Sequence, residues 1–451
     1  MDKKKNALIV IGTVVIVIIV MFGVYKLFFE KLSNEEAAQV LKSRIVPLST
    51  VEPGSDFKDL EPLKEVLKDK QIVAMGGSTY GTSEFFKVKH RMFQFLVEEM
   101  GYRVFAIDGE YGQAKTINDY IVNGTGTAEE VIKVMKIAVL FSWSAEESLA
   151  LVNWMREYNE NPSNKEKIKF YGIYSSQVSQ NTRDVLKYLQ VNDEEMYKAF
   201  DIKLKALKND NLYMMDPSEL KEHKSKAEEL ISIVKEKRDI FISRTSDEEY
   251  DEILHQAQVI IQCVDFAIYN SVEHSREDGI NTLGKYMAEN VKWILEHEGK
   301  QGNNKVMIWA NNSYVSKDST KYKTVGAQLS EMFKDKYYSI GIEFHQGEFV
   351  ALPAENGSIV SKIYKNYSIP EGNPKLFSNV FKVTENQISF LDLNSASQDK
   401  KINKILSASR IMHNIAGYNG YEEEYYSIEV PIKGYDGLIF INDTTAIKVI
   451  R

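Results

Sequence analysis

Two carboxylates, Asp108 and Glu110, follow an apolar run and are separated by a single glycine. A pair of carboxylates beside a glycine-flanked turn can act as a general base or as ligands. The preceding run, 103–108, has the short apolar pattern of a buried strand. We therefore expect Asp108 and Glu110 at the carboxyl end of a strand, which is where open α/β sheets place their ligands.

Two further segments combine small and polar residues directly after apolar runs. Residues 76–81 have the sequence Gly-Gly-Ser-Thr-Tyr-Gly, and residues 309–314 have the sequence Trp-Ala-Asn-Asn-Ser-Tyr. Their polar side chains, Tyr80, Asn311 and Tyr314, can donate and accept hydrogen bonds and could line a ligand pocket. Neither segment contains a histidine. An unperturbed tyrosine, with a pKa near about 10, is a poor general base at neutral pH.

The segment 83–100 has the periodicity of an amphipathic helix, and His90 on this helix is a candidate for the site. His90 shares one face with Phe86 and Phe93, so it should point inward, where a structural histidine is commoner than a catalytic one. Lys89 places a positive charge on the same helix. His345 follows a strand-like run and could enter the pocket, although an exposed loop position is the simpler interpretation.

Other catalytic patterns are weak or missing. Ser78 resembles the serine of a nucleophile elbow, but position 80 is Tyr80 and the second glycine arrives one residue late. A phosphate-binding loop would need a Gly-Lys-Ser/Thr ending, which does not occur there. The single cysteine, Cys263, excludes an internal disulfide and a cysteine-based zinc site. We expect no metal and no cofactor.

The charge of the chain argues against nucleic-acid binding. Its 64 acidic and 56 basic residues give a formal net charge of −8 and form no long block of one sign. Affinity for nucleic acid depends on a phosphate-seeking basic surface, which this composition does not supply. A small-molecule ligand remains the expected partner.

The first residues of the chain predict a membrane anchor. Residues 6–25 carry no charge and match the roughly 20 residues needed to cross a bilayer. Lys3, Lys4 and Lys5 precede this run, so the positive-inside tendency predicts a cytoplasmic tail at 1–5, a transmembrane helix at 6–26 and an extracytoplasmic main domain. A cleaved signal peptide is the alternative, but the run is long and no small-x-small site follows it. We expect a stalk at 27–56.

The rest of the chain, 57–451, predicts one α/β domain with a mainly parallel sheet flanked by helices. Apolar runs of strand type occur at 71–76, 103–108, 168–173, 305–309, 338–344, 387–392 and 437–442, with helical segments between them. Residues 173–278 lack glycine and use Lys, Glu, Leu and Ile heavily. This composition predicts a helical insertion at about 180–280.

Several motifs, taken in order from about Gln71, resemble those of the erythromycin esterase family. They are Glu84-Phe85-Phe86, Lys89-His90-Arg91, Phe105-Ala106-Ile107-Asp108, Asn118-Asp119-Tyr120, Phe170-Tyr171-Gly172, Met287-Ala288-Glu289-Asn290-Val291, Trp309-Ala310-Asn311-Asn312 and the ending from Tyr435 to Ala446. The family consists of bacterial hydrolases that open macrolide lactones, with many relatives of unknown substrate. The resemblance implies an α/β core with a helical insertion.

The chain departs from the family pattern at its catalytic positions. Gly77 and Tyr80 stand where the family motif has a glutamate and a histidine. Asn311 and Tyr314 stand where a second motif has two histidines, and Asp108 replaces a glutamate with a shorter carboxylate. The basic position on the first helix is kept as Lys89. An Arg-Asp pair that is common before Met287 is replaced, with Leu283 and Gly284 nearby.

Three functions are compatible with these residues. The first is a membrane-anchored pseudoenzyme that binds a small molecule or an envelope partner through Gly77, Tyr80, Lys89, Asp108, Glu110, Asn311 and Tyr314. The second is an active ester or lactone hydrolase that uses Asp108 or Glu110 as its base, aided by His90 or His345. The third is a structural protein of the bacterial cell envelope. General-base catalysis is worth about 10²–10⁴-fold, so the loss of three histidines and a glutamate should abolish the ancestral reaction.

Overall fold

The computed structural model describes residues 34–136, 144–271, 273–355, 358–361, 363–370, 375–382, 384–419 and 425–450. Its centre is a mixed, mostly parallel sheet with the strand order β1-β9-β13-β6-β2-β5-β3-β4. The strands from β13 to β4 run parallel, whereas β9 is antiparallel to both β13 and β1. The bounds are β1 Val46–Leu48, β2 Ile72–Met75, β3 Val104–Glu110, β4 Lys169–Tyr174, β5 Val306–Trp309, β6 Tyr337–Glu355, β9 Ile388–Asp392 and β13 Gly437–Thr444.

Short strands extend the sheet at the far end of β6. They are β7 Ser358–Ile359, β8 Lys365–Ile369 and β11 Tyr418–Asn419. A separate antiparallel pair is formed by β10 Arg410–His413 and β12 Tyr426–Glu429. The strand-type runs of the sequence therefore coincide with β2, β3, β4, β5, β6, β9 and β13.

Helices cover both faces of the sheet. Alternate residues of each central strand point to opposite faces, and the apolar side chains on both faces are buried against these helices. In β2, Ile72 and Ala74 belong to one buried cluster and Val73 and Met75 to the other. The second cluster is completed by α3 Glu61–Leu67, α4 Ser83–Met100, α5 Tyr111–Asn123, α6 Ala128–Met135 and α7 Glu146–Glu160. The first is completed by the helical insertion and by α13 Arg276–Gly299 and α15 Val325–Phe333.

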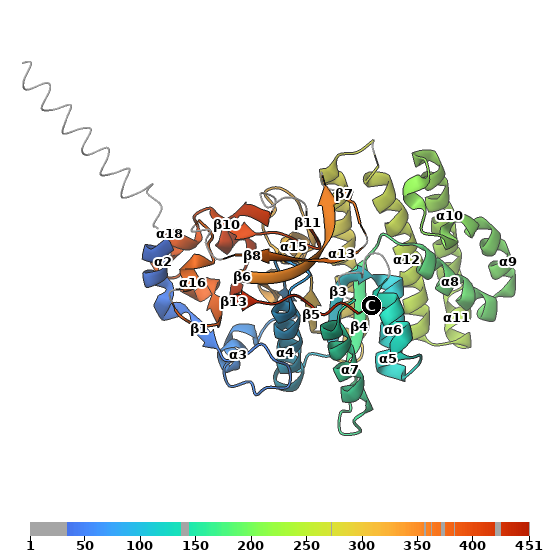
Figure 1. Ribbon diagram of the computed structural model, residues 1–451. Coiled ribbons are helices and arrows are strands. Elements are labelled where there is room, and N and C mark those ends of the chain that lie inside the picture. Colours follow the sequence, from blue (N-terminus) through green and yellow to red (C-terminus); the bar gives the residue numbers. More distant parts are fainter. Residues whose placement is uncertain are drawn as a thin grey trace, which may run out of the picture.

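The helical insertion lies beyond the β4 edge of the sheet, at the right of Figure 1. It comprises α8 Ser179–Asn192, α9 Glu194–Lys203, α10 Pro217–Glu236, α11 Arg238–Arg244 and α12 Asp247–Tyr269. Helix α10 begins at Pro217, directly after the Asp216 cap, whose side chain accepts hydrogen bonds from the backbone of Ser218 and Glu219. The remaining short helices are α2 Asn34–Leu41, α14 Asn312–Val315, α16 Asn379–Lys382, α17 Leu393–Ala396, α18 Lys400–Leu406 and α19 Pro431–Gly434.

The predicted anchor at 6–26 lies outside the described residues. No helix within the described ranges has the length and apolarity to cross a membrane. The structure differs from the predicted stalk, 27–56, over residues 34–56, because α2 and β1 are part of the domain. Strand β1 pairs with β9, and Ala37, Ala38 and Leu41 are fully buried.

A buried ion pair attaches the segment after β1 to helix α4. The guanidinium of Arg91 donates to both carboxylate oxygens of Asp59, at 3.0 and 2.5 Å, and to the backbone carbonyls of Thr50 and Asp56. Arg91 is 1% exposed. The segment between β1 and α3, which the sequence predicts as the end of a stalk, is therefore bound to the domain.

Candidate functional site

The register of the sheet brings the three polar segments of the sequence to one edge. Trp309 of β5 pairs with Met75 of β2 on one side and with Ile107 of β3 on the other. The chain therefore leaves these three parallel strands at the same level. The backbone of Asn312 donates to the carbonyl of Gly77 at 3.0 Å, which joins two of the segments directly.

Tyr80 and Asp108 are in direct contact at this edge. The Tyr80 hydroxyl donates a hydrogen bond to Oδ2 of Asp108, and the backbone of Asn311 also donates to this carboxylate. Burial raises the pKa of Asp108, while Tyr80 and Lys89 oppose that shift. Burial, together with the charge of Asp108, raises the pKa of Tyr80 well above its usual value. Tyr80 therefore acts as a hydrogen-bond donor and not as a base.

Lys89 supplies a buried positive charge next to this carboxylate. Its side chain is 2% exposed, and Nζ lies 4.5 Å from the ring centroid of Trp309 and 3.4 Å from the carbonyl oxygen of Ala310. Burial lowers the pKa of Lys89, and the charge of Asp108 opposes that shift. Gly77 leaves room for this lysine, because a Cβ built at Gly77 would lie 3.2 Å from Nζ.

Tyr314 stands beside the same pair and contacts a tyrosine that the sequence did not indicate. Its ring meets that of Tyr174, at the end of β4, edge to face with centroids 6.4 Å apart. Tyr314 also acts electrostatically on Tyr80 and contributes to raising the pKa of that residue. Only the position of β4 next to β3 reveals Tyr174, since its sequence neighbourhood is that of an ordinary strand end.

Asn311 provides a buried donor in the same cluster. The residue is 2% exposed, and its Oδ1 accepts from the backbone and hydroxyl of Ser313, both at 2.9 Å. Its Nδ2 is buried and has no hydrogen-bond partner among the described residues. By contrast, the neighbouring Asn312 is structural: its amide bonds both the carbonyl and the N–H of Ile342 on β6, each at 3.0 Å.

Glu110 is held separately by the segment after β4. Its carboxylate accepts hydrogen bonds from the backbone and hydroxyl of Ser176, at 3.0 and 2.5 Å, and from the backbone of Gln177 at 3.0 Å. Burial nevertheless raises the pKa of Glu110 to about 7. An irregularity in the β3–β4 register between Ile107 and Glu110 accompanies this arrangement. Gly172 is required there, because a Cβ would lie 2.5 Å from the carbonyl oxygens of Gly109 and Glu110.

His90 faces a different part of the core from Lys89. Its ring lies 5.5 Å from that of Trp154 on α7, and burial lowers the pKa of His90 to about 4. Adjacent helical residues project about 100° apart, so α4 directs Lys89 towards the strand ends and His90 towards α7. The predicted inward face of α4 is observed, since Phe93 also packs against Trp154.

Two histidines on or next to β6 are buried. His345 is 3% exposed within β6, so the interpretation as an exposed loop residue was wrong. His413, to which the sequence assigned no role, places Nδ1 3.0 Å from a carboxylate oxygen of Glu343 and stacks on Phe344. Because Glu343 and His413 are 70 residues apart, no local sequence signal pairs them.

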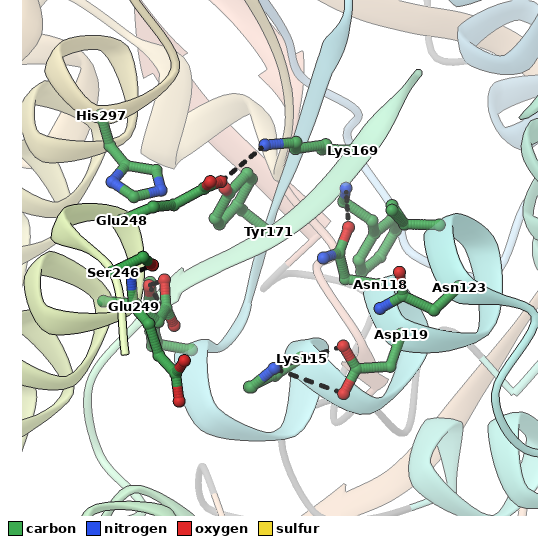
Figure 2. Close-up of a pocket in the computed structure, with 14 residues that line it drawn as sticks. Lys115, Asn118, Asp119, Asn123, Lys169, Tyr171, Ser246, Glu248, Glu249 and His297 are labelled. Carbon is green, nitrogen blue, oxygen red and sulfur yellow. Dashed lines mark hydrogen bonds and ion pairs between the residues drawn. The ribbon is translucent and has the colours of Figure 1, made fainter. Parts of the chain in front are cut away.

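Two cavities, of about 310 and 340 Å³, lie beside α5 and are lined by other residues. Figure 2 shows the first, with Lys115, Asn118 and Asp119 of α5 opposite Glu248, Glu249 and His297. Among the residues that the structure describes, no three His, Cys, Asp or Glu side chains are grouped so as to hold a metal ion.

Comparison with known proteins agrees with this arrangement. The family model described as erythromycin esterase matches residues 97–444. The chain belongs to the erythromycin esterase family. Erythromycin esterase type II of Escherichia coli is 25% identical over 360 residues, covering 74% of this chain and 83% of the relative. The Bacillus subtilis protein YbfO, which is named as a provisional hydrolase, is 24% identical over 421 residues. The match covers 87% of this chain and 88% of the relative.

Three solved structures have the same fold as this chain. A Bacillus cereus protein superposes with a TM-score of 0.82 at 22% identity and covers 93% of this chain and all of its own. A protein described as a succinoglycan biosynthesis protein gives 0.79 at 24% identity, covering 92% and 99%. An erythromycin esterase mutant in its open conformation gives 0.64 at 13% identity, covering 89% and 98%.

Proposed function

We propose that this chain is a membrane-anchored, extracytoplasmic member of the erythromycin esterase family whose ancestral hydrolysis is impaired. On this proposal the old catalytic cleft binds a small molecule or an envelope partner. The observation that carries it is the Tyr80–Asp108 hydrogen bond. The family motif has a histidine at this position, whereas here the Tyr80 hydroxyl donates a hydrogen bond to the carboxylate.

The charge states of the cluster support binding more than water activation. A general base needs a pKa near the working pH, and the pKa of Tyr80 is displaced away from that range. Lys89 and the unpartnered Nδ2 of Asn311 are instead buried donors at the same strand ends. A buried donor without a partner among the described residues, such as Nδ2 of Asn311, is costly, and a ligand oxygen would satisfy it. We therefore expect a ligand that presents a carbonyl, hydroxyl or carboxylate oxygen to these groups.

The anchor and the location are part of the same proposal. An uncharged run at 6–25 after three lysines supports a single-pass protein with a cytoplasmic N-terminus in a bacterial cell membrane. The ligand would then be met outside the cytoplasm. Protease protection of tags placed at each end of the full-length protein in intact cells tests this topology, and a protease-accessible N-terminus would contradict it.

A hydrolysis screen tests the loss of activity. The full-length protein in nonionic detergent should give no turnover of macrolides, lactones or simple esters. Turnover that disappears in Asp108→Asn would overturn the proposal. A variant carrying Gly77→Glu, Tyr80→His, Asn311→His and Tyr314→His should regain ester cleavage if the pocket has kept its shape and only these four side chains differ.

A working hydrolase with a carboxylate base is the second candidate, because burial raises the pKa values of both Asp108 and Glu110. The pKa of Glu110, about 7, lies in the range useful for general-base catalysis. Such an enzyme would lose activity in Glu110→Gln or Asp108→Asn while retaining its fold. If turnover persists in both variants, this second candidate fails.

A further inference from the structure

The two cavities beside α5 share part of their lining and together form a groove. Both are lined by Lys115 and Asp119 of α5 and by Glu249 of α12. The first cavity extends from these residues to β4 and α13, and the second extends between α5 and α8. We call this combined space the α5 groove. Its lining is separate from the Tyr80–Asp108 cluster.

The lining of the α5 groove is rich in carboxylates, two of which accept hydrogen bonds from neutral donors. Glu252 accepts from the Tyr111 hydroxyl, with both oxygens at 3.1 Å, and from the Gln256 amide at 3.0 Å. Asp184 accepts from the Gln180 amide at 2.9 Å. Burial raises the pKa of Glu252, and it raises the pKa of Asp184 to about 6. The positive charge of Lys115 acts on both carboxylates but only partly offsets the effect of burial on their pKa values.

The lysines of the α5 groove include two that already have carboxylate partners. Lys115 lies 3.2 Å from Asp119 Oδ1, and the charges of Asp119, Glu252 and Asp184 all raise the pKa of this one lysine against its burial. Lys169 is 2.9 Å from the fully buried Glu298 and 3.7 Å from Glu248. Five carboxylates against three lysines line the groove, so its field is negative.

An independent observation concerns the side-chain amide of Gln256. Gln256 lines the second cavity and is fully buried, and its Oε1 has no hydrogen-bond partner among the described residues. Its Nε2 donates a hydrogen bond to Glu252. This amide oxygen, on a residue that lines the same cavity as Asp184 and bonds Glu252, offers a third acceptor to an ammonium donor, which carries three N–H groups and no acceptor.

We propose that the α5 groove binds an extended organic cation with at least two ammonium groups, of the polyamine class. One ammonium would be held by Glu252, Asp184 and the Gln256 amide oxygen, and the other by Glu249 and Glu248 on α12. The methylene chain would pass the aromatic side chains of Tyr111 and Tyr188, which line the two cavities. This site is distinct from the cleft of the proposed function and does not depend on it.

Titration calorimetry of the full-length protein in nonionic detergent tests the proposal, with spermidine as the probe at low ionic strength. We expect saturable binding that weakens about tenfold or more in Asp184→Asn/Glu252→Gln, because amide isosteres remove the charges and keep the shape. Glu194→Gln, an exposed glutamate on α9, is the matched control and should bind as the unmodified protein does. The neutral probe 1,8-octanediol, of comparable length, should give no saturable heat.

The proposal is overturned if spermidine does not saturate, if the double variant binds it with unchanged affinity, or if 1,8-octanediol binds equally well. Thermal unfolding of the double variant shows whether its fold is intact. Should it fail to fold, the exposed Glu249→Gln replaces it, with an expected loss of severalfold in affinity. An unchanged affinity in Glu249→Gln would then count against the proposal.

Discussion

The hydroxyl of Tyr80 donates a hydrogen bond to the buried carboxylate of Asp108, with the Lys89 ammonium acting on the same carboxylate. A tyrosine, an aspartate and a lysine from three separate elements thus form one desolvated cluster. Each group modifies the protonation of the others, because interactions between charges are stronger in a dry environment. The following substitutions separate their contributions.

Removing the Tyr80 hydroxyl should raise the pKa of Asp108 further, since the hydrogen bond from Tyr80 lowers it. We expect Tyr80→Phe to cost about 1–3 kcal/mol in the free energy of unfolding, because a buried carboxylate loses a donor. Urea denaturation gives the free energy, and a ¹³C NMR titration of the Asp108 carboxyl gives the pKa. Tyr314→Phe is the control, and an equal rise in the Asp108 pKa in both variants would contradict a specific role for Tyr80.

Introducing a carboxylate at position 77 should raise the pKa of Lys89. A Cβ at Gly77 would lie 3.2 Å from Lys89 Nζ, 3.2 Å from Phe85 Cδ2 and 3.3 Å from the Thr79 carbonyl, so Gly77→Glu fits with small shifts. An opposite charge at this range changes a pKa by about 1–3 units. An NMR titration of the Lys89 side chain measures it. Gly77→Gln has the same shape without the charge. A similar rise in the pKa of Lys89 in this variant would contradict the electrostatic explanation.

Glu110 should make stability depend on pH. Burial raises its folded-state pKa from 4.5 to about 7, so its contribution is fully present below pH 4.5 and is lost as the pH rises through about 7. Glu110→Gln removes this loss while keeping an acceptor for Ser176 and Gln177. Relative to the unmodified protein, the variant should gain on the order of 3 kcal/mol above pH 7. Unfolding curves across this range test it, with the exposed Glu296→Gln as the control.

Asn312 should matter more for stability than its neighbour Asn311. Asn312→Ala removes two hydrogen bonds to the backbone of Ile342 and leaves a buried N–H and a buried carbonyl unpaired, which should cost about 3 kcal/mol. Asn311→Ala removes only the cap of the short helix α14, which should cost about 1 kcal/mol. Chemical denaturation of both variants compares them. Equal losses would show that Asn312 does not hold β6 against the strand ends.

The Arg91–Asp59 pair should hold the segment before α3 on the domain. Asp59→Asn leaves the buried Arg91 without its carboxylate and should cost about 3 kcal/mol. Limited proteolysis between residues 50 and 59 should also become faster. Asp56→Asn is the control, since the Asp56 carboxylate is exposed and only its backbone carbonyl meets Arg91. If cleavage rates do not differ between the two variants, this segment is held by other contacts.

Many of the elements could be predicted from the sequence because their signals are local. The run 72–75 forms a strand for reasons contained within it, namely short length, apolar side chains and a following glycine pair. The start of α10 at Asp216 and Pro217 is equally local, because a cap needs only its own first turn. Residues 34–56 were predicted as part of a stalk, but they pack on the domain. Composition cannot show this, because tertiary contacts decide whether such a segment packs.

The candidate site could be predicted only in part. Parallel strands end at a common edge of the sheet, so the sequence alone predicts that Tyr80, Asp108 and Asn311 lie near one another. It could not show that Tyr80 donates to Asp108, that Glu110 is bound by Ser176, or that Tyr174 stands against Tyr314. Each of these contacts joins residues from separate elements, and the side-chain directions depend on how those elements pack.

The sequence by itself determined the family, the order of strands and helices, and the absence of histidine from the two segments after β2 and β5. These properties reside in residue types and spacings along the chain. The tertiary structure alone decided which of two adjacent residues, Lys89 or His90, faces Asp108. It also paired His413 with Glu343 and opened the α5 groove. The physical reason is that desolvation and charge act through space, between groups that the chain brings together only when it folds.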